Sequence, residues 1–127
     1  MTLNPSLKVT IEFNDPELEP EERDKQAQRL IAELRDLDDV ETVERVSDSN
    51  LSEGTKSIGG FLVGLLTAEV KVDNSKKLFG FLKDRLGGKS IEFTVEANGK
   101  KLTAKASSRE ELDYAIAKAN DFIEKWQ

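Results

Sequence analysis

The sequence predicts an α+β fold in which helices cover one face of an open β-sheet, giving a two-layer sandwich. Apolar and polar residues alternate strictly in three short segments, as in strands that expose one polar face. Apolar residues recur at three- and four-residue spacing over 20–37 and 109–126, which is typical of amphipathic helices. The 127 residues are enough for one hydrophobic core, so we expect a single domain over 1–127.

The first 46 residues predict a strand, a helix and a second strand. Residues 7–13 place Leu, Val, Ile and Phe on one face and Lys, Thr and Glu on the other. Pro20 fits the first turn of a helix, which we expect over 20–37. Residues 40–46 are rich in β-branched side chains and predict a strand whose register the pattern leaves open.

Residues 56–69, KSIGGFLVGLLTAE, contain an uncharged run over 57–68 in a chain that is 35% charged. We expect a helix over 57–68, about 18 Å long and too short to span a bilayer. A strand over 65–72 is a competing interpretation. On a helix, Gly60, Gly64 and Ala68 align on one face, where small residues let another backbone approach closely. This face either packs within the fold or binds a partner. The candidate partner-binding residues are Ile58, Gly60, Phe61, Leu62, Gly64, Leu65 and Ala68.

The second half of the chain predicts a helix, a β-hairpin and a final helix. Leucine and phenylalanine spacing predicts a helix over 75–86, which two glycines end. Asn98-Gly99 between two alternating segments is a strong hairpin signal. Ser108 and Glu111 have the spacing of a capping box at the start of the last helix. The predicted order is β-α-β-α-α-β-β-α, a broadly ferredoxin-like sheet whose strand order the sequence does not give.

Composition excludes several classes of function. The chain has no cysteine and no histidine, so thiolate chemistry, imidazole catalysis and the commonest metal ligands are absent. We therefore expect no enzyme, no metal and no cofactor. The net charge of −6 argues against nucleic acid. The N-terminus lacks the basic and apolar regions of a secretory signal, so we expect a cytoplasmic protein.

Two weaker patterns are explained more simply. Residues 54–57, GTKS, match the end of a phosphate-binding loop, but the first glycine of that motif is missing. Carboxylates that a hard cation would accept as ligands gather near the end of the first helix, at Asp36, Asp38, Asp39, Glu41 and Glu44. They lack the spacing of a calcium-binding loop, which favours a solvated helix end.

The chain from residue 54 onward resembles a known family. The segments that carry the resemblance are GTK at 54–56, the glycine-rich run at 58–66, LFGFL at 78–82, SIEFTV at 90–95, NG at 98–99 and ASSREE at 106–111. They are similar to the effector-associated constant component family of bacterial conflict systems. Where that family often carries Trp-Leu and an arginine run, this chain has FLKDR at 81–85.

The resemblance implies a small, non-enzymatic α+β adaptor or regulator. Such proteins are encoded beside effector enzymes, often trypsin-like or caspase-like peptidases, so the implied partner is an effector protein in a bacterial immunity system. Three alternatives stay open: a small-ligand sensor, a homo-oligomer, and attachment to a membrane surface through 58–66.

Overall fold

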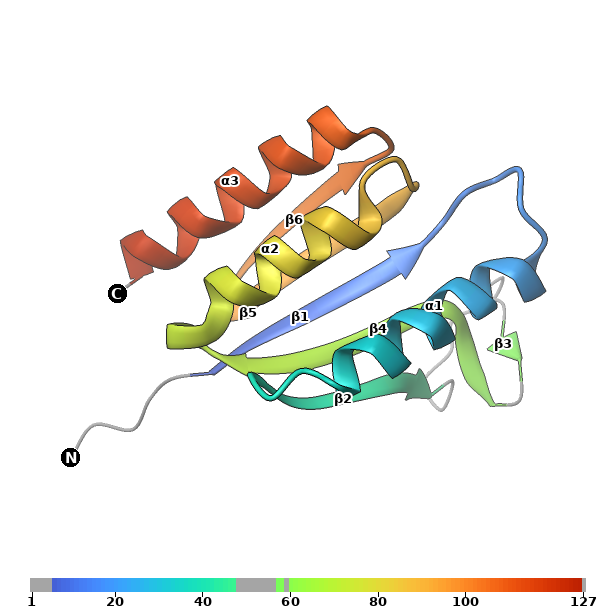
Figure 1. The fold of residues 1–127 in the computed structure, drawn as a ribbon, viewed down its shortest axis with the longest axis horizontal. Helices are drawn as coiled ribbons and strands as arrows, with labels where there is room; N and C mark the ends of the chain where they lie inside the picture. Colours follow the sequence, from blue (N-terminus) through green and yellow to red (C-terminus); the bar gives the residue numbers. More distant parts are fainter. Residues whose placement is uncertain (1–5, 48–56, 59, 127) are drawn as a thin grey trace.

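The computed structural model describes residues 6–47, 57–58 and 60–126. Within them the chain forms an α+β fold with one antiparallel, open sheet and three helices (Figure 1). The strands are β1 (Ser6–Phe13), β2 (Val40–Ser47), β3 (Ser57–Ile58), β4 (Phe61–Lys71), β5 (Ile91–Ala97) and β6 (Lys100–Ala106). The helices are α1 (Pro20–Arg35), α2 (Ser75–Leu86) and α3 (Arg109–Trp126), and a 3-10 turn, η1 (Val72–Asn74), precedes α2.

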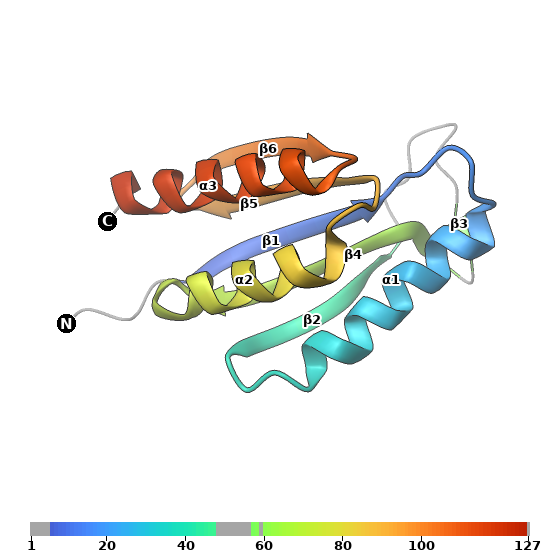
Figure 2. The same cartoon turned by 45° about the horizontal axis from the view of Figure 1, so that its top comes forward.

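The five long strands lie in the order β2-β4-β1-β5-β6, and every neighbouring pair is antiparallel. The two-residue strand β3 pairs only with β4. All three helices lie on the same face of the sheet, with α1 over β2 and β4 and α3 beside β6 (Figures 1 and 2). Among the described residues, the opposite face of the sheet therefore has no covering layer of helices.

The core lies between the sheet and the helices. Alternate residues of β1 and β5 point into it, as their apolar and polar alternation predicts, and all four on each strand are buried. Phe79 of α2 packs edge-to-face on Phe93 of β5, with ring centroids 5.9 Å apart. The buried apolar residues of all three helices and the five long strands form one connected cluster.

Local signals explain where the helices and the hairpin begin and end. The predicted helices 75–86 and 109–126 are confirmed, and the first helix ends at Arg35, two residues before the predicted 37. The Ser108 hydroxyl accepts a hydrogen bond from the Glu111 N–H at 3.1 Å. Asn98 and Gly99 have φ values of 53° and 75°, the positive angles that a two-residue hairpin turn requires.

The predicted helix over 57–68 is wrong. Residues 57–58 form β3, and the long strand β4 begins at Phe61. The competing prediction of a strand over 65–72 is therefore closer to the structure, although β4 begins four residues earlier than that prediction. A short apolar run has no period that separates a buried strand from a buried helix. Here β4 is central, with α1 on one face and partly covered Val63 and Leu65 on the other, which explains an apolar run without alternation.

Glycines fit this strand because the backbone departs from regular geometry. The pairing of β2 with β4 shifts between Arg45 and Ser47, and Gly64 lies on β4 within the irregular segment, with φ +71°. A Cβ at Gly64 would lie 2.7 Å from the Phe13 carbonyl oxygen. The residue is therefore constrained by both its conformation and the close approach of β1.

In the described part of the chain, no helix is long and apolar enough to cross a membrane.

Candidate interaction site

The seven predicted partner-binding residues do not form one surface, because a strand sends alternate side chains to opposite faces. Gly64 and Ala68 face α1 and are buried, whereas Leu65 is half-buried on the open face of the sheet. Ile58 pairs with Phe61, and Gly60 lies in the connection between them with φ +84°. Leu62 is half-buried. The helical face inferred from Gly60, Gly64 and Ala68 is thus absent.

Phe61 is the one predicted residue with a large exposed aromatic side chain, at 37% exposure. The Arg45 guanidinium lies 4.7 Å from the centre of its ring, a cation–π distance. Phe61 is therefore engaged by its own chain at the end of the sheet.

A buried polar cluster beside Gly64 holds α1 against the sheet. The Asp24 carboxylate is buried on the apolar side of α1 and forms an ion pair with Arg45 of β2. Its Oδ1 also accepts a hydrogen bond from the Gly64 N–H at 3.2 Å, and its Oδ2 accepts one from Gln28 at 3.0 Å. Each Asp24 carboxylate oxygen has a donor within the fold, so the observed bonds of this carboxylate join α1 to β2 and β4.

The open face of the sheet carries side chains in ordered rows across the strands. One row consists of threonines, in which Thr10 pairs with Thr67 and Thr94, and Thr94 pairs with Thr103. The hydroxyls of Thr94 and Thr103 are 3.2 Å apart. The neighbouring row alternates in charge, in the order Glu69, Lys8, Glu96 and Lys101. Cross-strand pairs of this kind stabilise a sheet.

A third row places two carboxylates opposite each other. Glu12 of β1 pairs with Glu92 of β5, which in turn pairs with Lys105 of β6. Partial burial of Glu12 and the nearby charge of Glu92 raise the pKa of the Glu12 carboxyl, while Arg23 and Lys105 act in the opposite direction. The two like charges of Glu12 and Glu92 repel each other when both carboxyls are ionised.

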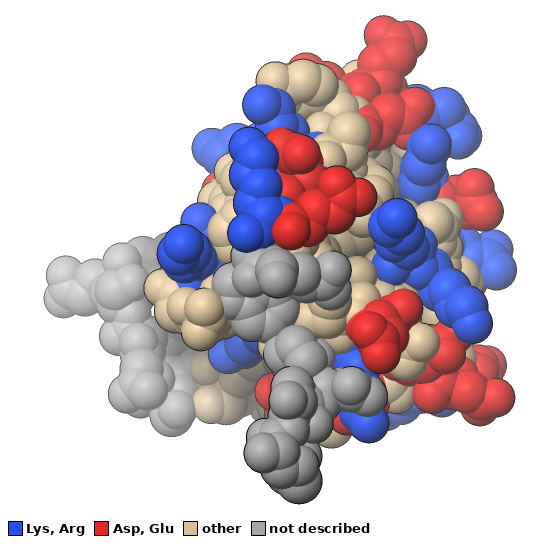
Figure 3. Space-filling view, turned by 90° about the vertical axis from the view of Figure 1, so that its left-hand side faces the viewer, with Lys and Arg blue, Asp and Glu red and all other residues tan. Residues whose placement is uncertain are grey.

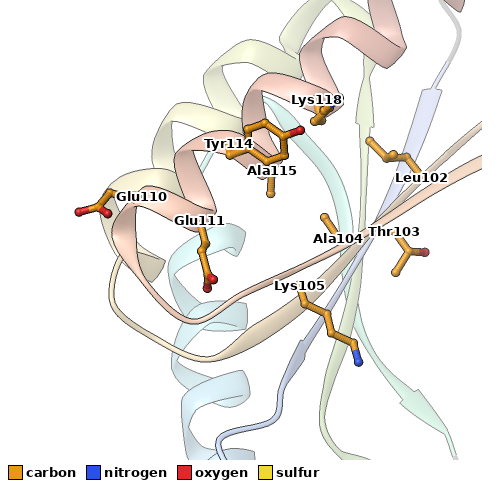
Figure 4. Close-up of a pocket in the computed structure, with 9 residues that line it drawn as sticks. All are labelled: Leu102, Thr103, Ala104, Lys105, Glu110, Glu111, Tyr114, Ala115 and Lys118. Carbon is orange, nitrogen blue, oxygen red and sulfur yellow. The ribbon is translucent and has the colours of Figure 1, made fainter.

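The strongest candidate for a binding site is a groove between β6 and α3, which we call the edge groove. It has a volume of about 610 Å³. Figure 4 shows that Leu102 and Ala104 of β6 point toward α3, where Tyr114 and Ala115 face them. Its lining residues are Leu102, Thr103, Ala104, Lys105, Glu110, Glu111, Tyr114, Ala115 and Lys118. The groove therefore has an apolar floor with charged residues at its margin.

Tyr114 is the most exposed large apolar side chain in the described part of the chain, at 65% exposure. The Lys118 ammonium lies 5.3 Å from its ring centre, a cation–π distance. Tyrosine combines apolar contact area with a hydroxyl and is enriched at protein interfaces. The residue thus marks the edge groove as a surface suited to a partner.

Glu111 lines the edge groove and is held in place by hydrogen bonds. Its carboxylate accepts bonds from the Ser107 N–H at 2.7 Å and the Ser107 hydroxyl at 2.9 Å. These bonds from Ser107, together with one donated by the Ser108 backbone N–H, lower the pKa of the Glu111 carboxyl. Glu111 is therefore ionised at neutral pH, and its carboxylate is engaged in hydrogen bonds at the start of α3.

Other features of the surface give weaker indications of a binding site than the edge groove does. At the end of the molecule where α2 begins and α3 ends, basic and acidic side chains are interspersed (Figure 3). Within the described residues, no three His, Cys, Asp or Glu side chains gather closely enough to hold a metal ion, the acidic residues 36–44 included. The GTK part of the GTKS segment lies outside the described residues.

No family model and no curated protein matches this chain.

Sequence reasoning missed the edge groove, although two signals for it were present. Tyr114 lies off the apolar residues Leu112 and Ile116 of the last helix, a position that places an aromatic side chain on the solvated side of that helix. The hairpin also predicted that β6 follows β5 with lysines on its polar face. What the sequence could not show is that β6 lies at the edge of the sheet.

Proposed function

We propose that this protein is a non-enzymatic adaptor or regulatory module that binds an effector protein, such as a trypsin-like or caspase-like peptidase, in a bacterial conflict or immunity system. The observation that carries the proposal is the position of β6. It pairs with β5 on one side, and nothing in the described part of the chain pairs with its other side, which borders the edge groove. An exposed sheet edge beside an apolar groove favours binding of an extended peptide segment.

The composition of the chain agrees with a binding role. A protein without histidine and cysteine would have to catalyse with carboxylates, lysines or hydroxyls. Glu12, whose carboxyl has a raised pKa, lies on the open sheet face and does not line the edge groove. The resemblance of residues 54–111 to effector-associated components supplies the class of partner in this proposal.

We further propose a ferredoxin-like arrangement for the part of the fold from β1 to β5, and a cytoplasmic location. The support for the first is that α1 connects β1 to β2 with β4 between them, while α2 connects β4 to β5 with β1 between them. Strand β6 and helix α3 extend this unit and form the edge groove.

The test is to recover a tagged full chain from its native cells and identify co-purifying proteins by mass spectrometry. A stoichiometric effector, such as a peptidase, is the expected result. Its activity with and without the purified chain then separates an activator or inhibitor from a tether. A clean preparation without any stoichiometric protein would contradict the adaptor function.

The alternative function is a small-ligand sensor, which the volume and apolar floor of the edge groove favour. It predicts that a metabolite or nucleotide raises the melting temperature and that Tyr114→Ser abolishes this shift. No shift across a broad panel at millimolar concentration would count against it.

A further inference from the structure

The free edge of β6 has a defined set of backbone groups. Ala97 and Lys100 flank the two-residue turn and form a hydrogen-bonded pair in this type of hairpin, and such pairs alternate along antiparallel strands. The N–H and C=O groups of Lys101, Thr103 and Lys105 therefore point away from β5. They are the groups that an added strand would bind.

The side chains of the same three residues lie on the open face of the sheet. Lys101 and Lys105 are exposed, and neither forms an ion pair within 4 Å with another described residue. Each has a glutamate as its neighbour on β5, at Glu96 and Glu92. The alternating charge row thus ends on a lysine, and the next strand outward would continue it with an acidic residue.

The other face of an added strand would meet the edge groove. Side chains next to Leu102 and Ala104 would enter the space in front of α3 and contact Tyr114 and Ala115 (Figure 4). The positions of the added strand that face the groove favour apolar side chains, because the groove would bury these side chains between carbon atoms of β6 and of α3. The two faces together specify an alternating acidic and apolar strand.

A second copy of this chain does not fit the same edge through its own β6. Antiparallel pairing about Thr103 would place Lys101 of one copy opposite Lys105 of the other, at both ends of the pair. Like charges directly opposite each other destabilise a sheet, and lysines on an edge strand oppose such self-pairing.

We propose that β6 binds an extended segment of a partner protein that has acidic residues opposite Lys101 and Lys105, a hydroxyl or β-branched residue opposite Thr103, and apolar residues facing the edge groove. This proposal rests on the adaptor function and names the chemistry of the segment that the adaptor recognises.

The probe is the peptide acetyl-Ser-Glu-Val-Thr-Val-Glu-Ser-amide, whose palindromic sequence fits β6 in either direction. It is titrated into the ¹⁵N-labelled full chain and observed by NMR. The amides of Lys101, Thr103 and Lys105 are expected to shift and to gain protection from hydrogen exchange. Those of Leu102 and Ala104 already bind β5 and gain less. An absence of shifts on β6 at millimolar peptide, or protection at another edge, would overturn the proposal.

Charge recognition is tested with a second peptide in which lysines replace both glutamates. The wild-type chain is expected to bind the glutamate peptide about tenfold more tightly. Lys101→Gln with Lys105→Gln should abolish that preference without creating a glutamate pair across β5 and β6. The matched control, Lys76→Gln with Lys77→Gln on α2, should retain it. Equal affinity of the wild type for both peptides would refute the charge pattern.

The role of the groove is tested with Tyr114→Ser, which removes an exposed ring and leaves the core intact. This substitution should weaken the binding of both peptides several-fold and leave the ratio of their two affinities unchanged. Unchanged affinity for both peptides would show that the added strand does not use the groove.

A capture experiment separates this proposal from the adaptor function. If an effector is recovered equally well by the wild type and by Lys101→Gln with Lys105→Gln, the adaptor function stands and the edge is refuted. If the effector is lost with this variant and kept with the α2 control, both are supported. Concentration-dependent dimerisation that protects the β6 amides would instead identify a second copy as the occupant and overturn the proposal.

Discussion

Replacement of Gly64 by alanine should destabilise the fold through two separable effects. A left-handed backbone conformation costs a non-glycine residue about 1–2 kcal/mol, and the loss of unfolded-state freedom returns about 0.4–1 kcal/mol. In addition, the new Cβ would lie 2.7 Å from the Phe13 carbonyl oxygen, so β1 and β4 must move apart. We expect a total loss of about 2–3 kcal/mol in the free energy of unfolding.

Two other glycines provide controls for these effects. Gly60 has φ +84°, but no atom of the other described residues lies within 4 Å of the place a Cβ would take, so Gly60→Ala should carry the conformational cost alone. Gly80 lies within α2, where a Cβ would enter open space, so Gly80→Ala should raise stability by about 0.5–1 kcal/mol.

The assay is urea unfolding followed by far-UV circular dichroism, with the midpoints of all four proteins compared. The expected order of stability is Gly80→Ala, wild type, Gly60→Ala and then Gly64→Ala. A loss of 2–3 kcal/mol corresponds to a fall in melting temperature of roughly 10 °C for a chain of this size. Equal losses for Gly60→Ala and Gly64→Ala would refute the argument from the Phe13 contact.

Three further predictions concern charged groups. Asp24→Ala should lower the free energy of unfolding by about 3 kcal/mol, because it leaves the partly buried Arg45 guanidinium without its partner, and an unchanged urea midpoint would contradict this. The pKa of the Glu12 carboxyl is higher in the folded protein than in the unfolded chain. Ionised Glu12 therefore lowers the free energy of unfolding above the folded-state pKa, and this loss of stability disappears as the pH falls toward the unfolded-state pKa. Glu12→Gln should therefore raise the urea midpoint at pH 7 and lose its advantage near pH 4, whereas a gain independent of pH would point to packing. The pKa of the Glu111 carboxyl is lower in the folded protein than in the unfolded chain. Its contribution to the free energy of unfolding is therefore fully present above the unfolded-state pKa and is lost as the pH falls through the folded-state pKa. Glu111→Gln should be less stable than wild type at pH 7 and should approach it in acid, and a constant difference in the midpoint would refute the assignment.

The sequence by itself determined the elements whose signals are local. The helix over 109–126 follows from its apolar seam and from Ser108 and Glu111, whose cap is formed by neighbours in the chain. The hairpin follows from Asn98-Gly99, because a two-residue turn with positive φ values fixes both its geometry and the register of the strands beside it.

Residues 57–68 show where local signals end. Glycine and alanine at four-residue spacing fit a helix face, yet Gly64 is required by the approach of β1, a contact between residues far apart in the sequence. The apolar run is satisfied because β1 and β2 flank β4 in the sheet and α1 covers it. Periodicity carries no information about which strands become neighbours.

The same reason explains why the sequence alone did not reveal the edge groove. The lysines of β6 and the exposed Tyr114 are visible in the sequence, and Asp24 can be placed on the apolar side of its helix. Only the strand order makes β6 an edge and sets it beside α3, and only the packing of α1 on β2 and β4 brings Asp24 to Arg45 and Gly64. Side-chain patterns fix what each segment can bury, whereas the pairing of distant segments decides which groups are left free to bind a partner.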